Sequence, residues 1–101
     1  MAFYVYILLC SDSSFYTGQT DNLEKRIYEH IAGKIAGCYT FNRRPIKLVY
    51  FHEFPTREEA LAAERQIKGW SHKKKEAMIQ GDWAEVSRLA NSVQSRSIEG
   101  H

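Results

Sequence analysis

A β-hairpin is predicted by residues 3–19, which read FYVYILLCSDSSFYTGQ. Apolar and aromatic side chains occupy both faces of residues 3–10, a pattern typical of a central strand. The polar run at 11–14 predicts a turn, and residues 15–19 again favour a strand. Gly18 interrupts this second strand, where it indicates a bulge, a close approach of another group, or simply the end of the strand.

A first helix is predicted from the capping residues at 21–24 to about Ala32, where Gly33 can end it. A loop follows over 33–45. A third strand is expected over 46–53, in which alternate residues should face opposite sides of the sheet. On the first predicted helix, apolar residues at every fourth position should form one buried stripe. The expected stripe comprises Leu23, Ile27 and Ile31.

Three further helices complete the predicted order of elements. A capping box at Thr56 opens a helix that continues to about Lys68, and Ser71 can cap a short helix through Ile79. A fourth helix is expected over 82–90. The predicted fold class is therefore α+β, with a small three-stranded, mainly antiparallel sheet flanked by helices in the order β-β-α-β-α-α-α.

Length and composition favour one domain. The chain has 101 residues, 44% of them hydrophobic and 26% charged, which suits one modest core. We expect a single domain over 1–91 and a disordered tail over 92–101, where no apolar periodicity remains. Without a leader or an apolar run of ~20 residues, a cytoplasmic protein with no membrane contact is expected. There Cys10 and Cys38 would stay reduced, as small buried apolar groups.

The net charge of +2 is unevenly distributed. Residues 34–75 hold ten Lys and Arg against four Glu, a net charge of +6, while the segments on either side carry −2 each. A nucleic-acid-binding surface needs such a basic block, because neutralisation of phosphates dominates binding. The alternative is that these side chains only solvate exposed faces. The residues expected to contact nucleic acid are Lys34, Tyr39, Arg43, Arg44, Lys47 and Lys68.

Helical angles single out Glu64. At 100° per residue, it falls about 40° from Ala60, inside the apolar stripe of its predicted helix. A carboxylate at the edge of the core needs a partner, because charged groups are rarely buried alone. The partner is either Lys68 or Arg65 in a salt bridge, or a metal ion.

Arg26 and His30 are four residues apart on the first predicted helix, at the border of its apolar stripe. Arginine presents a fork of donors that suits phosphate, and histidine can hold or move a proton. A lone histidine on a helix is more often a packed core residue. Tyrosines in the hairpin, among them Tyr6 and Tyr16, are equally typical of packing with one hydrogen bond.

In combination, these motifs resemble the GIY-YIG nuclease family. The two halves of its signature match YVY at 4–6 and YTG at 16–18, joined by a short turn. Arg26 and His30 follow on the first helix, and a glutamate lies within EEALAAERQIK at 58–68. The match covers roughly residues 3–80. More narrowly, the chain is similar to the small stand-alone bacterial members, the uncharacterised UPF0213-like branch.

The resemblance implies roles for five residues. Tyr6 and Tyr16 are the tyrosines of the two half-motifs. Arg26 would hold the scissile phosphate, and His30 corresponds to a helix histidine found in several members. Glu64 would bind a divalent metal, with Mg²⁺ or Mn²⁺ as the implied cofactor. The general base stays open among Tyr6, Tyr16 and His30.

Three positions depart from the family pattern. Tyr4 stands where the signature has glycine. Cys38 lies where close relatives tend to have a basic residue, which weakens one expected phosphate contact. Glu76 replaces an asparagine of the repair-type members, so that helper role is unfilled or is supplied by another group.

The resemblance implies a metal-dependent endonuclease that hydrolyses phosphodiester bonds in DNA. Its sequence specificity should be low, because the length leaves no room for a separate DNA-reading domain. DNA is the expected partner, with branched or damaged DNA as one option, and a protein partner or a homodimer would supply any further specificity. One alternative is a nucleic-acid-binding module with little or no hydrolytic activity, and another is an adaptor whose Trp70, Trp83 and aromatic surface engage another protein.

Overall fold

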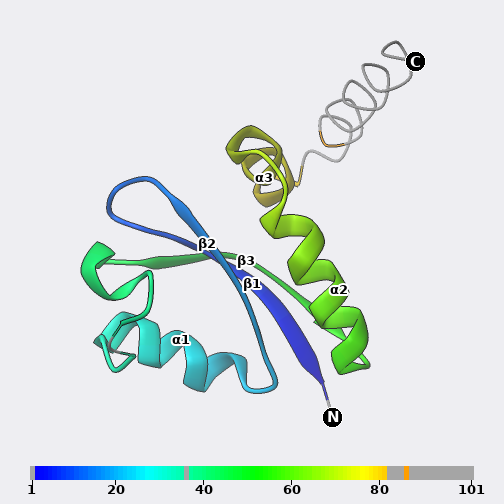
Figure 1. Ribbon diagram of the computed structural model, residues 1–101, viewed down its shortest axis with the longest axis horizontal. Helices are drawn as coiled ribbons and strands as arrows, with labels where there is room; N and C mark the ends of the chain where they lie inside the picture. The colour runs from blue at the N-terminus through cyan, green and yellow to red at the C-terminus, as the bar shows by residue number, and fades with distance from the viewer. Residues whose placement is uncertain (1, 36, 82–85, 87–101) are drawn as a thin grey trace. The chain divides into compact units, whose positions relative to one another are not determined.

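The computed structural model describes residues 2–35, 37–81 and 86. Its elements are β1 (Phe3–Leu9), β2 (Phe15–Thr20), α1 (Leu23–Ala32), the short 3₁₀ helix η1 (Phe41–Arg43), β3 (Lys47–Phe54), α2 (Arg57–Lys68) and α3 (His72–Ile79) (Figure 1). The predicted α+β class and the order β-β-α-β-α-α are confirmed. The expected fourth helix and the tail over 92–101 fall on residues outside the described ranges.

The three strands form one antiparallel sheet in the order β2-β1-β3, so β1 is the central strand, as predicted. Between β1 and β3 the register shifts: Ile7 pairs with Tyr50, but Leu8 pairs with Leu48, which leaves Val49 as an extra residue in a β-bulge. The simple alternation expected over 46–53 is therefore wrong at this point. Because a bulge moves later residues to the other face, sequence periodicity alone cannot follow the strand through it.

Local sequence sets the helix ends. The predicted capping signal starts at Asp21, but the residue that caps α1 is Asn22. Its side chain accepts a hydrogen bond from the Lys25 N–H. Gly33 ends α1 in the left-handed conformation with φ of 68°. Thr56 caps α2 in the predicted way. Figure 1 shows the sheet lying between α1 and α2.

The apolar stripe expected on α1 is not its buried face. Its buried residue is His30, whereas the side chain of Ile31 is 54% exposed. Leu23 and Ile27 are half-buried and line an apolar groove of about 360 Å³ with Leu48 of β3. The expectation of a buried stripe is thus wrong, because α1 meets the sheet through His30, about 100° around the helix from Ile31.

The chain divides into two compact units, with the boundary between Gly69 and Trp70. The first unit contains the whole sheet, α1 and α2, and the second contains α3. Every candidate site residue lies in the first unit. The single domain expected over 1–91 stays a prediction. None of the helices in the described ranges is long and apolar enough to cross a membrane.

Candidate functional site

Tyr6 of β1 lies at the centre of the candidate site. It pairs with Gly18 of β2, and its ring lies so close over that residue that an added Cβ would be 2.5 Å from the Tyr6 hydroxyl. Gly18 therefore marks a close approach and does not end the strand, which continues to Thr20. The Tyr6 hydroxyl lies 3.0 Å from Nε2 of His30 on α1. Tyr6 and His30 are almost completely buried.

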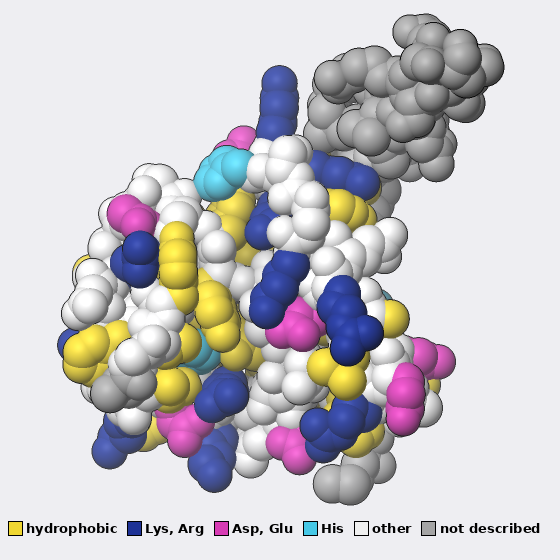
Figure 2. All heavy atoms as spheres, viewed as in Figure 1, with side chains coloured by type: hydrophobic (Ala, Val, Ile, Leu, Met, Phe, Trp, Pro, Cys, Tyr) yellow, Lys and Arg dark blue, Asp and Glu magenta, His cyan; other side chains and the backbone are white. Residues whose placement is uncertain are grey.

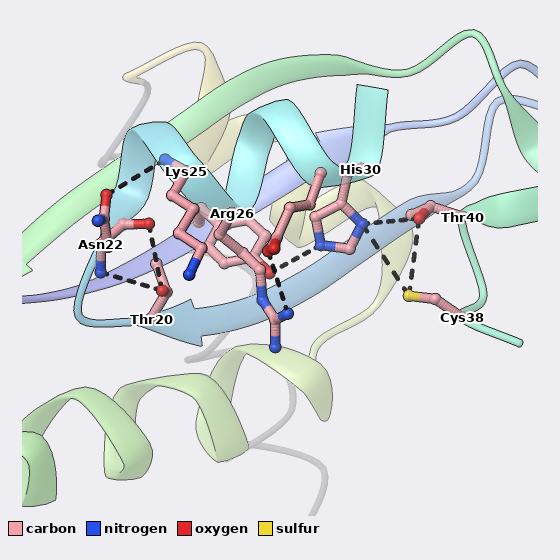
Figure 3. A network of polar contacts seen from close by, with 9 residues as sticks. Thr20, Asn22, Lys25, Arg26, His30, Cys38 and Thr40 are labelled. Atoms are coloured by element: carbon pink, nitrogen blue, oxygen red, sulfur yellow. Dashed lines mark hydrogen bonds and ion pairs between the residues drawn. The ribbon is translucent and has the colours of Figure 1, made fainter. Parts of the chain in front are cut away.

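The second ring nitrogen of His30 contacts the loop that precedes β3. Its Nδ1 lies 2.7 Å from Oγ1 of Thr40, and the Thr40 hydroxyl donates to Sγ of Cys38 at 3.6 Å. Figure 3 shows one ring nitrogen of His30 pointing toward Thr40 and Cys38 of this loop, while the other, Nε2, is bonded to the Tyr6 hydroxyl. Thr40, like His30, is buried. The sequence did not indicate this role for either residue of the loop, because no spacing or periodicity connects 38–40 to a helix ten residues earlier.

Tyr16 of β2 extends the aromatic cluster. Its ring centroid lies 6.4 Å from that of Tyr6 and 5.3 Å from that of His30. The ring of Tyr39 stacks on Tyr16 at 6.1 Å, with 21° between the planes. Tyr16 is also close enough to Cys38 for each to affect the pKa of the other. The structure thus brings both signature tyrosines and the helix histidine into one cluster.

Arg26 adds a positive charge at the rim of this cluster. Its guanidinium is close enough to act on the pKa of Tyr6 and forms an ion pair with Glu29 at 3.6 Å. The side chain of Arg26 is 43% exposed, so it combines proximity to the buried tyrosine with access to solvent. One turn separates it from His30, which places both side chains on the same face of α1, as the spacing predicts.

Burial decides the protonation states of the cluster. Burial, and next the neighbouring Tyr16, raise the pKa of Tyr6 well above its usual 10.0, against the opposing charge of Arg26. Burial likewise raises the pKa of Tyr16, and Cys38 adds to this effect. Burial and then Arg26 lower the pKa of His30 below 6.5. At neutral pH both tyrosines are therefore protonated and His30 is neutral.

Glu64 lies on α2 at the edge of the core, as its helical angle predicts. Only 15% of its side chain is exposed, and its carboxylate pairs with Lys68 at 3.3 Å. Its negative charge is also near enough to Tyr16 to contribute to the raised pKa of that residue. The first of the two partners considered for Glu64, a lysine in a salt bridge, is thus present in the structure.

Two of the residues expected to contact nucleic acid, Tyr39 and Arg43, contact other residues of the protein. The guanidinium of Arg43 lies 3.8 Å from the centre of the Tyr39 ring and donates to Asp12 at 3.0 Å and to the Tyr39 carbonyl at 2.8 Å. The Tyr39 ring therefore contacts both the Tyr16 ring and the Arg43 guanidinium. These contacts hold the loop against the β1–β2 hairpin, and much of the polar capacity of Arg43 is used for this purpose.

Three other basic residues are not joined to the cluster. Lys34 lies over the ring of Tyr28, Arg44 donates to the Phe41 carbonyl, and Lys47 is exposed at the start of β3. In the part of the chain that the structure describes, none of the three contacts the candidate catalytic side chains. Figure 2 shows that basic, acidic and hydrophobic side chains are interspersed on the face in view.

The two cysteines differ from each other. Cys10 is buried, as expected. Cys38 is only partly buried and has polar contacts, so its prediction as a buried apolar group is wrong. Its partial burial acts to raise the pKa of the thiol, but hydrogen bonds from the Thr40 N–H and hydroxyl, and from Tyr16, outweigh this and lower the pKa below 9.0. The sulfur is therefore an acceptor within the site.

Comparisons with known proteins show the family of this chain. A family profile described as the GIY-YIG catalytic domain matches residues 2–77. A UPF0213 protein of Haloquadratum walsbyi is 47% identical over 76% of this chain and 85% of its own length. The solution NMR structure of a UPF0213 protein from Bacillus halodurans is 44% identical over 79% of this chain and 84% of that one, with a TM-score of 0.52.

A second solution NMR structure, of a protein from E. faecalis, is 38% identical. It covers 80% of this chain and 85% of that one, with a TM-score of 0.57. Both structures are similar to the present chain in fold and in sequence.

Proposed function

Because this chain belongs to the GIY-YIG catalytic-domain family, we propose that it is a metal-dependent endonuclease that hydrolyses phosphodiester bonds in DNA. One observation carries the proposal: Tyr6, Tyr16 and His30, which come from two strands and a helix, meet in one cluster with Arg26 at its rim. Three separate elements have to fold together to form this arrangement, so packing of a single helix does not account for it.

Arg26 is the side chain we assign to the scissile phosphate. It is part-exposed and positively charged, and its fork of donors suits a phosphate. Tyr6 and His30 are buried behind it, so they act on the reaction through hydrogen bonds and not as the first surface that DNA meets. Tyr16 is less buried and is the hydroxyl best placed for contact with substrate.

A metal ion that assists cleavage would need ligands from the protein. In the described part of the chain no cluster of three or more His, Cys, Asp and Glu could hold a metal. A single carboxylate such as Glu64 nevertheless fits Mg²⁺ or Mn²⁺, which takes several of its ligands from water and from substrate phosphate. When bound, such an ion would neutralise charge that develops on the phosphoryl oxygens. Glu64 would hold it after releasing Lys68, which is then free for a phosphate.

DNA contacts are proposed for the basic residues around the cluster. Lys68 is adjacent to Glu64, and Lys34, Arg44 and Lys47 are exposed residues that we assign to phosphates. Phosphate contacts carry no sequence information, so low intrinsic specificity follows. A protein partner or a second copy of the chain would supply any preference for branched or damaged DNA. Free thiols at Cys10 and Cys38 are compatible with the proposed cytoplasmic location.

A nucleic-acid-binding module without hydrolytic activity is the second candidate. It is favoured by the ion pair between Glu64 and Lys68, because this pair competes with a metal for the only carboxylate assigned to the ion. Such a module would bind DNA in a salt-sensitive manner and yield no product at any metal concentration.

Nicking of supercoiled and branched DNA at graded Mg²⁺ and Mn²⁺ tests the proposal. Glu64→Gln should lower kcat by about 10²–10³-fold, since removal of one group that stabilises transition-state charge costs about this much. DNA binding should be retained. The matched control is Glu58→Gln, which changes an exposed glutamate on the same helix and should leave the rate unchanged.

The two candidate functions give different results in this assay. Loss of cleavage in Glu64→Gln with wild-type activity in the control supports the nuclease. Equal cleavage by Glu64→Gln and the wild-type protein would contradict the role of Glu64. Binding without cleavage by the wild-type protein would favour the module.

A further inference from the structure

A chain of side-chain hydrogen bonds runs behind the two tyrosines of the site. It connects the Tyr6 hydroxyl to His30 Nε2 at 3.0 Å, His30 Nδ1 to Thr40 Oγ1 at 2.7 Å, and the Thr40 hydroxyl to Cys38 Sγ at 3.6 Å (Figure 3). Tyr6, His30 and Thr40 are each no more than 2% exposed. Because bulk water has almost no access to these groups, the hydrogens must be shared among the side chains themselves.

The direction of these bonds follows from counting hydrogens. A threonine hydroxyl has one hydrogen, and the Thr40 hydroxyl donates it to Cys38. Thr40 Oγ1 must then accept from His30, so Nδ1 carries the hydrogen of the neutral ring. His30 Nε2 consequently has a free lone pair and accepts the hydrogen of the Tyr6 hydroxyl.

The Tyr6 end of this series of hydrogen bonds supports the same direction. Arg26 lies close enough to Tyr6 for its positive charge to act on the phenol, and a guanidinium has donors only, so it favours the phenol oxygen as an acceptor and leaves the phenol hydrogen for His30. At the other end, the sulfur of Cys38 accepts from the Thr40 hydroxyl and also lies 4.0 Å from Nδ1 of His30. The lowered pKa of Cys38 agrees with its role as an acceptor.

We infer that Thr40 is a positioning residue: its hydroxyl accepts the Nδ1–H of His30 and so keeps Nε2 as the acceptor for the Tyr6 proton. In its catalytic consequence this inference rests on the proposed nuclease function. When the proton moves, the Tyr6 O–H bond breaks and an N–H bond forms at Nε2, leaving a phenolate beside Arg26 and an imidazolium bonded to Thr40. The opposite tautomer has a hydrogen on Nε2 and cannot accept this proton.

The tautomer of His30 can be read directly from side-chain ¹H–¹⁵N correlations at neutral pH in the full chain. The wild-type protein should show protonated Nδ1 and unprotonated Nε2. Thr40→Val removes the hydroxyl and would leave Nδ1–H only the longer, weaker contact to Cys38 Sγ at 4.0 Å, so the Nε2–H tautomer should gain population. Thr40→Ser retains the hydroxyl and should restore the wild-type pattern. Thr17→Val is the control, because Thr17 has a buried hydroxyl with no hydrogen-bond partner within the described residues.

Two variants of Cys38 test whether its sulfur sets the direction of the hydrogen bond between Thr40 and His30. In Cys38→Ala the Thr40 hydroxyl loses the sulfur, is free to donate to Nδ1, and should shift His30 to the Nε2–H tautomer. Cys38→Ser keeps an acceptor and should retain Nδ1–H. If Cys38→Ala and Thr40→Val both keep the wild-type tautomer, the inference is overturned, and the same holds if the wild-type ring carries its hydrogen on Nε2.

Cleavage gives a separate readout. Thr40→Val should lower kcat by about 10²-fold, the lower end for loss of positioned proton transfer, with little change in KM, and Thr40→Ser should recover most of it. A variant with the altered tautomer and an unchanged kcat would overturn the catalytic consequence. If the wild-type protein cleaves no DNA, the proposed function fails, while the NMR experiment still decides whether Thr40 sets the tautomer.

Discussion

Gly18 stands opposite Tyr6 in the ladder between β1 and β2, and no side chain could fit between its backbone and the Tyr6 ring. Gly18 has no positive φ in this structure, so the requirement is for space and not for an unusual backbone conformation. A glycine at this strand position therefore belongs to the site as much as the tyrosine does, because it admits the ring to the place where it meets His30.

Gly18→Ala should destabilise the protein. Its Cβ would lie 2.6 Å from Cζ of the buried Tyr6 ring, so the ring must move and the bond to His30 must lengthen. Overpacking of this kind costs about 1–3 kcal/mol in the free energy of unfolding, which urea titration would measure. Gly69→Ala is the matched control, because its nearest neighbour is 3.5 Å away. Equal urea midpoints for Gly18→Ala and wild type would show that the sheet adjusts without cost.

His30 should make stability depend on pH. Its burial, and then Arg26, lower its pKa in the folded protein below the ordinary 6.5. The unfolded chain therefore binds a proton at a higher pH than the folded protein, so stability is fully present above about pH 6.5 and falls as the pH drops below that value. Free energies of unfolding at pH 7.5 and 5.5 would measure the loss.

His30→Asn removes the titrating group and is the control for this effect. The variant should show a smaller dependence on pH over the same range, whatever its absolute stability. The lowered pKa of Asp12 affects stability only near and below its ordinary value of 3.8, which is outside this window. An undiminished pH dependence in His30→Asn would assign the effect to other groups.

At the scale of elements, α1 is the helix whose packing differs most from its sequence pattern. Leucine and isoleucine at every fourth position predict a buried stripe, but the helix is anchored by His30, and Ile31 is 54% exposed. The polar contacts of His30 to Tyr6 and Thr40 orient α1. The periodicity of apolar residues along a helix does not predict such polar contacts.

The same substitution on two helices tests this orientation. Ile67 of α2 is buried, so Ile67→Ala should cost about 2–4 kcal/mol, because apolar burial is removed and a cavity is left behind. Ile31→Ala should change the free energy of unfolding by less than about 0.5 kcal/mol, as surface substitutions usually do. Urea titration of both variants would measure the difference. A large cost at Ile31 would mean that the exposed face of α1 is covered in solution.

At the scale of the whole molecule, charge is distributed in blocks along the sequence but is mixed in space. The +6 segment over 34–75 includes residues that pair with acids, such as Lys68 with Glu64, and residues that hold the loop, such as Arg43 with Asp12. Each pair removes part of the positive charge that DNA would meet. The basic residues outside such pairs should therefore dominate DNA affinity.

Salt dependence would measure their contribution. Replacing Lys34, Arg44 and Lys47 by glutamine should weaken DNA binding and reduce the slope of log K against log salt by about 0.9 for each phosphate that the protein no longer neutralises. Arg57→Gln is the control, since Arg57 lies over Phe3 and is not assigned to DNA. An unchanged slope in the triple variant would exclude these residues from the interface. Fluorescence anisotropy with labelled duplex at several salt concentrations is suitable.

Local sequence patterns correctly predict the hairpin, the central position of β1, the caps of α2 and α3 and the place of Glu64 at the core edge. These features depend on residues close in sequence and on the periods of strand and helix. The motifs also identified Tyr6, Tyr16, Arg26 and His30 as candidates. The tertiary structure decided that His30 and not Ile31 is buried, that β3 bulges at Val49, and that Thr40 and Cys38 contact His30. Contacts between distant segments depend on where whole elements pack, and local sequence patterns do not record that arrangement.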